Sequence, residues 1–320
     1  MNLSDIPSRI AKLFAVNGSK NTIPVDSSSS TLSAGKATYD SGYPPLTMTA
    51  ISAGGIPPSG QDMNGILYDI TRKQQWRDAG GGFPFDSTFA TAIGGYPSGA
   101  IIPSSDFSGF WQNTVNNNLV NPESAATGTG WVPQDFYGSS LISVSTANVT
   151  ASALQAARNE IILSGTLTAN RYLYLPSWVK SWRIVNNCTG SFKIVISLTS
   201  GTDTVDSFPG SVIDIRGDGS GIYLSQPVSL TLPGYQQLSS GLVMQFGSVD
   251  VLPGATATVS YKKPFQNAAI MGVACKGASI TDTEYACGIE SGKSSATIKN
   301  SLNTSSPSVA QGIRWFVIGY

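Results

Sequence analysis

Acidic side chains stand close together in sequence at two places, Asp203 with Asp206 and Asp282 with Glu284. Two carboxylates in a turn between strands can serve as the acid and base of a glycosidase, or as oxygen ligands of Ca²⁺. A glycosidase also needs a fixed carboxylate separation in an aromatic-lined cleft, and Ca²⁺ needs further oxygen ligands nearby. The simpler interpretation, which we favour, is that each pair keeps a loop end soluble.

Histidine is absent from the sequence. This absence excludes Ser-His-Asp and Cys-His nucleophile systems, His-ligated zinc, and the commonest general base at neutral pH. The three cysteines, Cys188, Cys275 and Cys287, lack CxxC spacing, and we expect ordinary buried thiols. Cys275 and Cys287 could face each other on neighbouring strands, but a disulfide is disfavoured. We therefore expect no enzyme, no metal and no cofactor.

Three glycine-containing motifs have simple structural explanations. SAGKAT (33–38) partly matches the phosphate-binding loop pattern. Ser30, upstream of it, stands where that loop needs its first glycine, and Ala37 stands where the loop needs Ser or Thr. GDGSG (217–221) lies between two strand-like runs with no helix after it, which predicts a hairpin turn. The RGD tripeptide in the same turn is short enough to occur by chance.

The composition indicates a folded, β-rich protein of several domains. The chain has 320 residues, 12% charged residues and no net charge, with many Gly, Ser, Thr, Asn and Pro. No Lys or Arg lies between Arg77 and Arg158, which disfavours a nucleic-acid partner. No apolar run reaches the roughly 20 residues of a membrane span, and the start lacks a signal peptide. We expect cytosolic synthesis and no membrane insertion.

Apolar spacing predicts helices near the start of the chain. Residues 4–14 place Ile6, Ile10 and Phe14 at helical spacing, and the pattern over 60–79 is stronger, ending at three glycines. Residues 17–58 between these helices have no sustained period, which predicts an extended arm.

Strand patterns dominate the rest. Residues 83–137 alternate aromatic and turn residues, which predicts short strands and little helix. Residues 144–226 and 235–320 carry strand-like runs separated by Gly, Asn or Ser, and 227–235 reads as a linker. The fold class expected is mainly β, with short N-terminal helices and small antiparallel, sandwich-like domains.

Two blocks resemble tail-fibre proteins of tailed bacteriophages and prophages. The first contains GIPPSGQ, QDMNGILYDI and AIGGYP in order, and resembles the module that joins such fibres to the tail. The second, from LPGYQQLSSGLVMQFGSV to RWFVIGY, resembles the C-terminal tail-fibre domain, which usually reads GGxxxQWG near its start. Here Ser240 replaces the first glycine and Phe246 replaces the tryptophan, which keeps a ring but loses an indole N–H. The middle block, 152–201, is similar to a β-module repeated in phage tail proteins.

The resemblance implies an elongated, modular, homotrimeric fibre of the virion tail. It implies a tail or baseplate protein at the N-terminal end and a bacterial surface receptor, lipopolysaccharide or an outer-membrane protein, at the C-terminal end. A last strand as apolar as WFVIGY fits burial in a sheet or at a subunit interface. A structural tail adaptor and a polysaccharide-cleaving tailspike are the alternatives.

The domains expected are a tail-attachment module (1–105), a connector (106–139), a spacer (140–226), a linker (227–232) and a receptor-binding domain (233–320). Receptor contacts are expected on turns between C-terminal strands, over 276–285 and 291–295, because turns vary freely while strands hold position. The side chains expected to make these contacts are Lys276, Asp282, Glu284, Tyr285 and Lys293. Most aromatic side chains are expected in cores, and Tyr285 is the one expected near a loop end.

Overall fold

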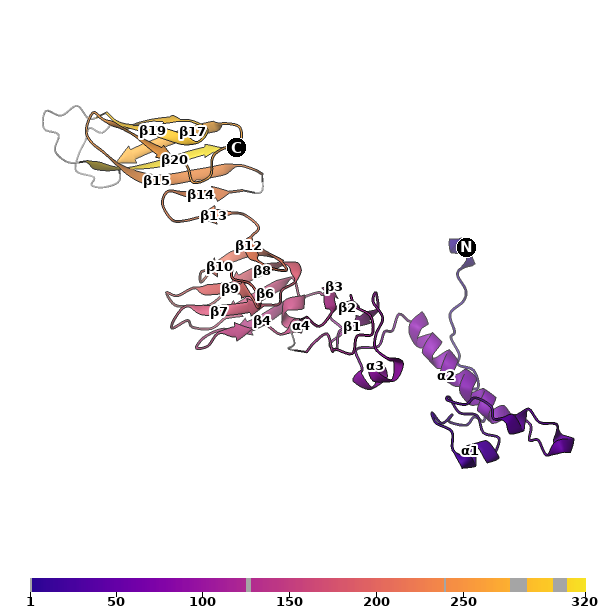
Figure 1. Ribbon diagram of the computed structural model, residues 1–320. Coiled ribbons are helices and arrows are strands. Elements are labelled where there is room, and N and C mark those ends of the chain that lie inside the picture. The colour runs from indigo at the N-terminus through magenta and orange to yellow at the C-terminus, as the bar shows by residue number, and fades with distance from the viewer. Residues whose placement is uncertain (1, 125–127, 239, 277–286, 302–309) are drawn as a thin grey trace. The chain divides into compact units, whose positions relative to one another are not determined.

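The secondary structure is mainly β, as predicted, and the chain forms two compact units, 1–85 and 86–320. The computed structural model describes residues 2–124, 128–238, 240–276, 287–301 and 310–320 (Figure 1). No helix among the described residues is long and apolar enough to cross a membrane.

The first unit is built around one long helix, α2 (Gly60–Asp78), which is the helix predicted over 60–79. Asp62 in its first turn is buried, and its carboxylate accepts hydrogen bonds from Asn21 Nδ2 at 2.6 Å and Ala37 N at 2.9 Å. These bonds hold the arm against α2. The arm contains short helices in place of a purely extended chain: α1 (Ser29–Ser33), η2 (Pro45–Thr47) and η3 (Ile51–Ala53).

The helix predicted over 4–14 is wrong. Only a 3-10 turn, η1 (Leu3–Asp5), forms, and the backbone after it bonds to side chains of α2. Ile10 N donates to Asp78 Oδ2 at 3.1 Å, and Gln75 Nε2 donates to Ile10 O at 2.9 Å. Formation of the first turn of a short helix costs free energy. Here side chains of α2 bond to the backbone of this segment in place of a helix's own hydrogen bonds.

The second unit begins with a small sheet whose core is partly polar. It contains α3 (Ser87–Ile93), a helix in a stretch where little was expected, and the antiparallel strands β1 (Ile101–Pro103), β2 (Phe110–Asn113) and β3 (Trp131–Gln134). The two hydrogens of the buried Asn113 amide are shared among three backbone carbonyls within 3.0 Å of its Nδ2, among them Pro97 O at 2.8 Å. Such bonds replace the hydrogen bonds to water that burial removes.

The middle of the chain winds back and forth between two sheets (Figure 1). From β4 to β9 successive strands alternate between the sheets, and equivalent strands of successive turns pair in parallel. The antiparallel arrangement expected for this region therefore holds only at its C-terminal edge, where β10, β11 and β12 reverse direction. The elements are β4 (Ser139–Ser143), β5 (Val149–Thr150), α4 (Ala153–Ala157), β6 (Glu160–Ser164), β7 (Arg171–Leu175), β8 (Val179–Asn186), β9 (Ile194–Leu198), β10 (Thr204–Ser207), β11 (Val212–Asp218) and β12 (Ile222–Leu224).

Aliphatic side chains from both sheets fill the space between them. β9 is buried at every position, and Trp182 of β8 is 1% exposed within the same core. GDGSG forms the turn between β11 and β12, as predicted, with Gly221 N donating to Asp218 Oδ1 at 2.7 Å. This turn brings β12 beside β11 at one edge of its sheet.

The C-terminal part is the antiparallel, two-sheet domain that the strand spacing predicts. One sheet has the order β13-β14-β15-β20-β17 and the other β16-β19-β18. The strands are β13 (Val228–Ser229), β14 (Gly234–Gln237), β15 (Val243–Val251), β16 (Thr256–Ser260), β17 (Ala269–Lys276), β18 (Cys287–Ser291), β19 (Ser295–Asn300) and β20 (Gln311–Gly319). The stretch expected to be a linker thus contributes β13 to the larger sheet.

We expect the stability of the second unit to depend on pH through the carboxyl group of Asp106. Its carboxylate accepts from Ser104 Oγ at 2.8 Å and Ser108 N at 3.0 Å, and pairs with Arg158 Nη2 at 2.7 Å. Burial raises the pKa of this carboxyl, but the hydrogen bonds from Ser108, Ser104 and Arg158 outweigh burial and hold the pKa well below its usual range. Because the folded pKa is the lower one, the stabilisation is complete above the unfolded value of about 3.9 and is lost as pH falls below it.

We expect Asp106→Asn to lower the urea midpoint of unfolding at pH 7, with a cost of roughly 1 to 2 kcal/mol. The gap between wild type and variant should narrow as pH falls below about 4. Urea unfolding at pH 7, 5 and 3 measures this, with the exposed Asp214→Asn as the control. A gap that stays the same at all three values would contradict the assignment.

Candidate functional site

The larger C-terminal sheet has two apolar faces. Along β15 and β20 alternate residues are buried, and the inner face packs against the smaller sheet through residues such as Trp315 and Val317. The intervening side chains point to the outer face, because successive residues of a strand point to opposite sides.

The outer face carries two rows of apolar side chains across three neighbouring strands. The register aligns Met244, Ile318 and Met271 in one row, and Phe246, Phe316 and Val273 in the next. Met271 and Val273 are 55% and 52% exposed, and the other four are half-buried. We call these six residues the outer apolar patch.

Glycines opposite aromatic rings shape both faces of this sheet. Gly234 faces Phe246, and a Cβ on Gly234 would lie 2.4 Å from Cε2 of that ring. On the inner face Gly247 faces Trp315, and a Cβ there would lie 2.5 Å from Cζ2. The Phe246 ring thus covers the bare backbone of Gly234.

A third row of the outer face is polar. It contains Ser248, Arg314 and Cys275. The expectation of three buried cysteines holds only for Cys188, because Cys275 is exposed and Cys287 is half-buried. Both Cys275 and Cys287 are free thiols. Burial raises the pKa of Cys287, which disfavours its thiolate form.

The predicted contact residues are only partly within the described structure. Asp282, Glu284 and Tyr285 lie outside the described residues. Lys276 is the last residue of β17, and the exposed Lys293 lies in the turn between β18 and β19, where its carbonyl accepts from Phe265 N at 2.9 Å.

Lys276 and Lys293 lie at opposite ends of the facing strands β17 and β18. A Cβ on Gly272 of β17 would lie 2.2 Å from Ser291 Oγ at the end of β18. The turn that holds Lys293 therefore lies beyond this point, toward the start of β17, while Lys276 ends that strand. The structure does not bring these two lysines together.

The outer apolar patch was not among the predicted contact residues, although a signal for it was present. The runs VMQF and WFVIG are apolar at both odd and even positions, which is typical of strands covered on both faces. Among the described residues no group of three His, Cys, Asp or Glu side chains could hold a metal ion.

Comparison with known proteins relates the C-terminal domain to tail fibres. The family model described as "Putative tail fiber protein gp53-like, C-terminal" matches residues 237–320. No curated protein matches the chain.

Solved pyocin fibres share limited similarity with the chain. A P. aeruginosa R2 pyocin fiber comprising C-terminal residues 323–691 is 21% identical over 30% of this chain and 26% of that chain, with a TM-score of 0.27. An N-truncated R1-type pyocin tail fiber is 22% identical over 30% of this chain and 87% of that one, with a TM-score of 0.26. The chain spans about a quarter of the first of these structures.

Proposed function

We propose that this tail-fibre chain, whose residues 237–320 belong to the gp53-like C-terminal family, adsorbs to the bacterial surface by non-covalent recognition. The observation that carries the proposal is the family match over these residues, which form the two-sheet domain. On this proposal the N-terminal module attaches to a tail or baseplate protein, residues 140–226 act as a spacer, and residues 233–320 recognise a glycan or an outer-membrane protein.

Receptor contacts are assigned to the turns and strand ends of the C-terminal domain. Lys276 and Lys293 present cations at its two ends, and Asp282, Glu284 and Tyr285 belong to the connection between β17 and β18. Lys293 lies in a turn and Lys276 at the last position of its strand, where side chains can vary at little cost to the sheets.

Binding of labelled full-length chain to a panel of bacterial strains tests the function. We expect saturable binding that disappears in host mutants lacking one surface component, either lipopolysaccharide or a single outer-membrane protein. Absence of adsorption to every strain, at any concentration, would overturn the proposal. Shortened chains after incubation with host polysaccharide would instead favour the tailspike alternative.

The structural adaptor is separated from a receptor-binding fibre by the position of the C-terminus. A label fused after Tyr320 should lie at the outer end of the fibre in images of whole virions. A label inside the particle would favour the adaptor.

We further propose that the chain is a homotrimer in which the outer apolar patch is covered by other copies. The patch is too apolar to remain in water at low cost, since burial of apolar surface contributes about 25 cal/mol per Å². The low charge of the chain keeps electrostatic repulsion between copies small. Closed threefold symmetry would cover the patch without open-ended association.

We expect Phe316→Asp to reduce the assembly from three times the 33.4 kDa chain mass to a single chain, because a carboxylate would be buried without a partner. Light scattering coupled to size exclusion measures the mass, and circular dichroism checks the fold. Thr256→Asp, at an exposed position of β16 in the other sheet, is the matched control. A wild-type chain that is monomeric, or a folded Phe316→Asp trimer, would contradict the interface.

A further inference from the structure

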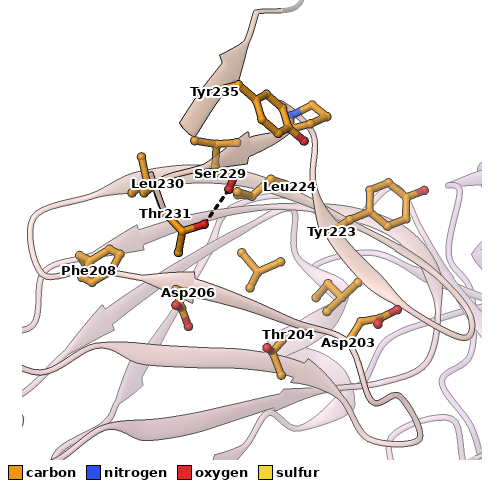
Figure 2. Close-up of a pocket in the computed structure, with 14 residues that line it drawn as sticks. Asp203, Thr204, Asp206, Phe208, Tyr223, Leu224, Ser229, Leu230, Thr231 and Tyr235 are labelled. Atoms are coloured by element: carbon orange, nitrogen blue, oxygen red, sulfur yellow. Dashed lines mark hydrogen bonds between the residues drawn. The ribbon is translucent and has the colours of Figure 1, made fainter. Parts of the chain in front are cut away.

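A hollow of about 810 Å³ opens beside β10 and β12, and no residue of the outer apolar patch lines it. This volume falls within the range of sites that bind small molecules, roughly 300 to 1,000 Å³. Figure 2 shows its lining, which comes from β10, β12 and the segment around β13: Asp203, Thr204, Val205, Asp206, Phe208, Ile222, Tyr223, Leu224, Pro227, Val228, Ser229, Leu230, Thr231 and Tyr235.

Three aromatic rings surround the hollow. Figure 2 shows Phe208 and Tyr223 on opposite sides and Tyr235 above them. Phe208 is 50% exposed and Tyr223 is 44% exposed, so both keep open surface. Exposed aromatic rings with a polar rim are suited to a ligand that has an apolar face and polar edges.

Polar groups of both hydrogen-bonding types lie between these rings. Within the described part of the chain, the exposed Asp203 carboxylate has no hydrogen bond or ion pair, and it accepts only. Asp206 Oδ2 pairs with Lys193 Nζ at 2.5 Å, which leaves its other oxygen as an acceptor. The hydroxyls of Ser229 and Thr231, 3.2 Å apart, can donate or accept (Figure 2).

Charges of both signs lie around the hollow. Asp203 and Asp206 are matched by Lys193, which pairs with Asp206, and by Lys262, whose Nζ donates to Ser229 Oγ at 2.7 Å and Thr231 Oγ1 at 2.6 Å. Both cations already have oxygen partners, and the carboxylate without one is Asp203. An anionic ligand would therefore be repelled by the Asp203 carboxylate, whereas a neutral ligand would not.

We infer that this hollow binds an uncharged saccharide. A pyranose ring offers a face of C–H groups that can lie on Phe208 or Tyr223, and its hydroxyls can donate to Asp203 and Asp206 and accept from the hydroxyls of Ser229 and Thr231. The inference rests on the proposed function, since it names a neutral sugar of the host surface as one bound group. It places that contact beside the spacer strands, separate from the C-terminal turns.

Isothermal titration of the full-length chain tests the inference. The probes are neutral di- to tetrasaccharides of glucose, galactose, mannose and N-acetylglucosamine, with oligogalacturonic acid as the anionic comparison. We expect at least one neutral probe to bind and the anionic probe to bind more weakly. Phe208→Ala and Tyr223→Ala should each raise Kd roughly tenfold or more.

The matched control is Phe192→Ala, which removes a ring of similar exposure, 41%, from a position outside the hollow. Asp203→Asn is a second variant, and it should weaken binding without removing any ring. Failure of every neutral probe to bind, or an equal loss in the Phe192→Ala control, would overturn the inference.

Adsorption of the same proteins to cells, measured in parallel, separates this inference from the proposed function. Adsorption without saccharide binding would overturn the inference and leave the function standing. Saccharide binding without adsorption to any strain would overturn the proposed function and leave saccharide binding at the hollow standing.

Discussion

Replacement of Trp182 by alanine is expected to lower the free energy of unfolding of the second unit by about 4 kcal/mol. Trp182 is 1% exposed in the core between the two middle sheets, and its Nε1 donates to Ala156 O at 2.7 Å. The substitution removes the ring and leaves both a cavity and a buried carbonyl without that donor. Urea unfolding followed by circular dichroism measures the loss.

Two further variants separate the contributions of Trp182. Trp182→Phe keeps a ring but removes the hydrogen bond, so it should cost about half as much or less. Tyr172→Ala removes a ring that is 38% exposed on β7, and its cost should be well below that of Trp182→Ala. An unfolding midpoint of Trp182→Ala equal to that of wild type would show that this core does not stabilise the unit.

Gly65→Ala is expected to detach the arm from α2, a result opposite in sign to the usual effect of alanine in a helix. Alanine normally stabilises a helix interior by about 1 kcal/mol relative to glycine. Here a Cβ on Gly65 would lie 2.1 Å from Asn21 O and 3.2 Å from Ile23 Cδ1. Since the first contact is with backbone, the arm must move, at a cost of roughly 1 to 3 kcal/mol.

Limited proteolysis measures this detachment, because the arm over 17–58 should be cut faster in Gly65→Ala than in wild type. Gly60→Ala is the matched control in the same helix, since a Cβ on Gly60 has no atom within 4 Å. Equal cutting of wild type and Gly65→Ala would contradict the close approach of arm and helix.

Local sequence patterns predicted the helices and strands better than they predicted which strands pair and in which direction. The helical spacing before Gly80 identified α2, and alternating strands identified the C-terminal domain, because both depend on side chains near in sequence. The parallel winding of the middle strands was not predicted. Alternation tells which side chains face a core, but not the direction of the neighbouring strand.

In the candidate sites, too, the residues near in sequence were predicted and those that only folding brings together were not. Asp203 and Asp206 were recognised as a close pair, but the rings opposite them come from Tyr223 and Tyr235, which only folding brings near. The outer apolar patch likewise requires the register of three strands. For residues 4–14 the apolar spacing predicted a helix that does not form beyond Asp5. The segment is instead held by hydrogen bonds to side chains of α2.

The winding of the middle strands repeats at a nearly constant interval along the chain. Glu160 pairs with Arg183 in one sheet and Arg171 with Ile194 in the other, 23 positions apart in both cases. In the preceding coil the spacings are close to this, 21 positions for Ser139 and Glu160 and 24 for Val149 and Leu173. Insertion of 23 residues between these turns would therefore add one coil without changing which side chains face inward. Each added coil would lengthen the stack of strands by about 4.8 Å, the spacing between neighbouring strands.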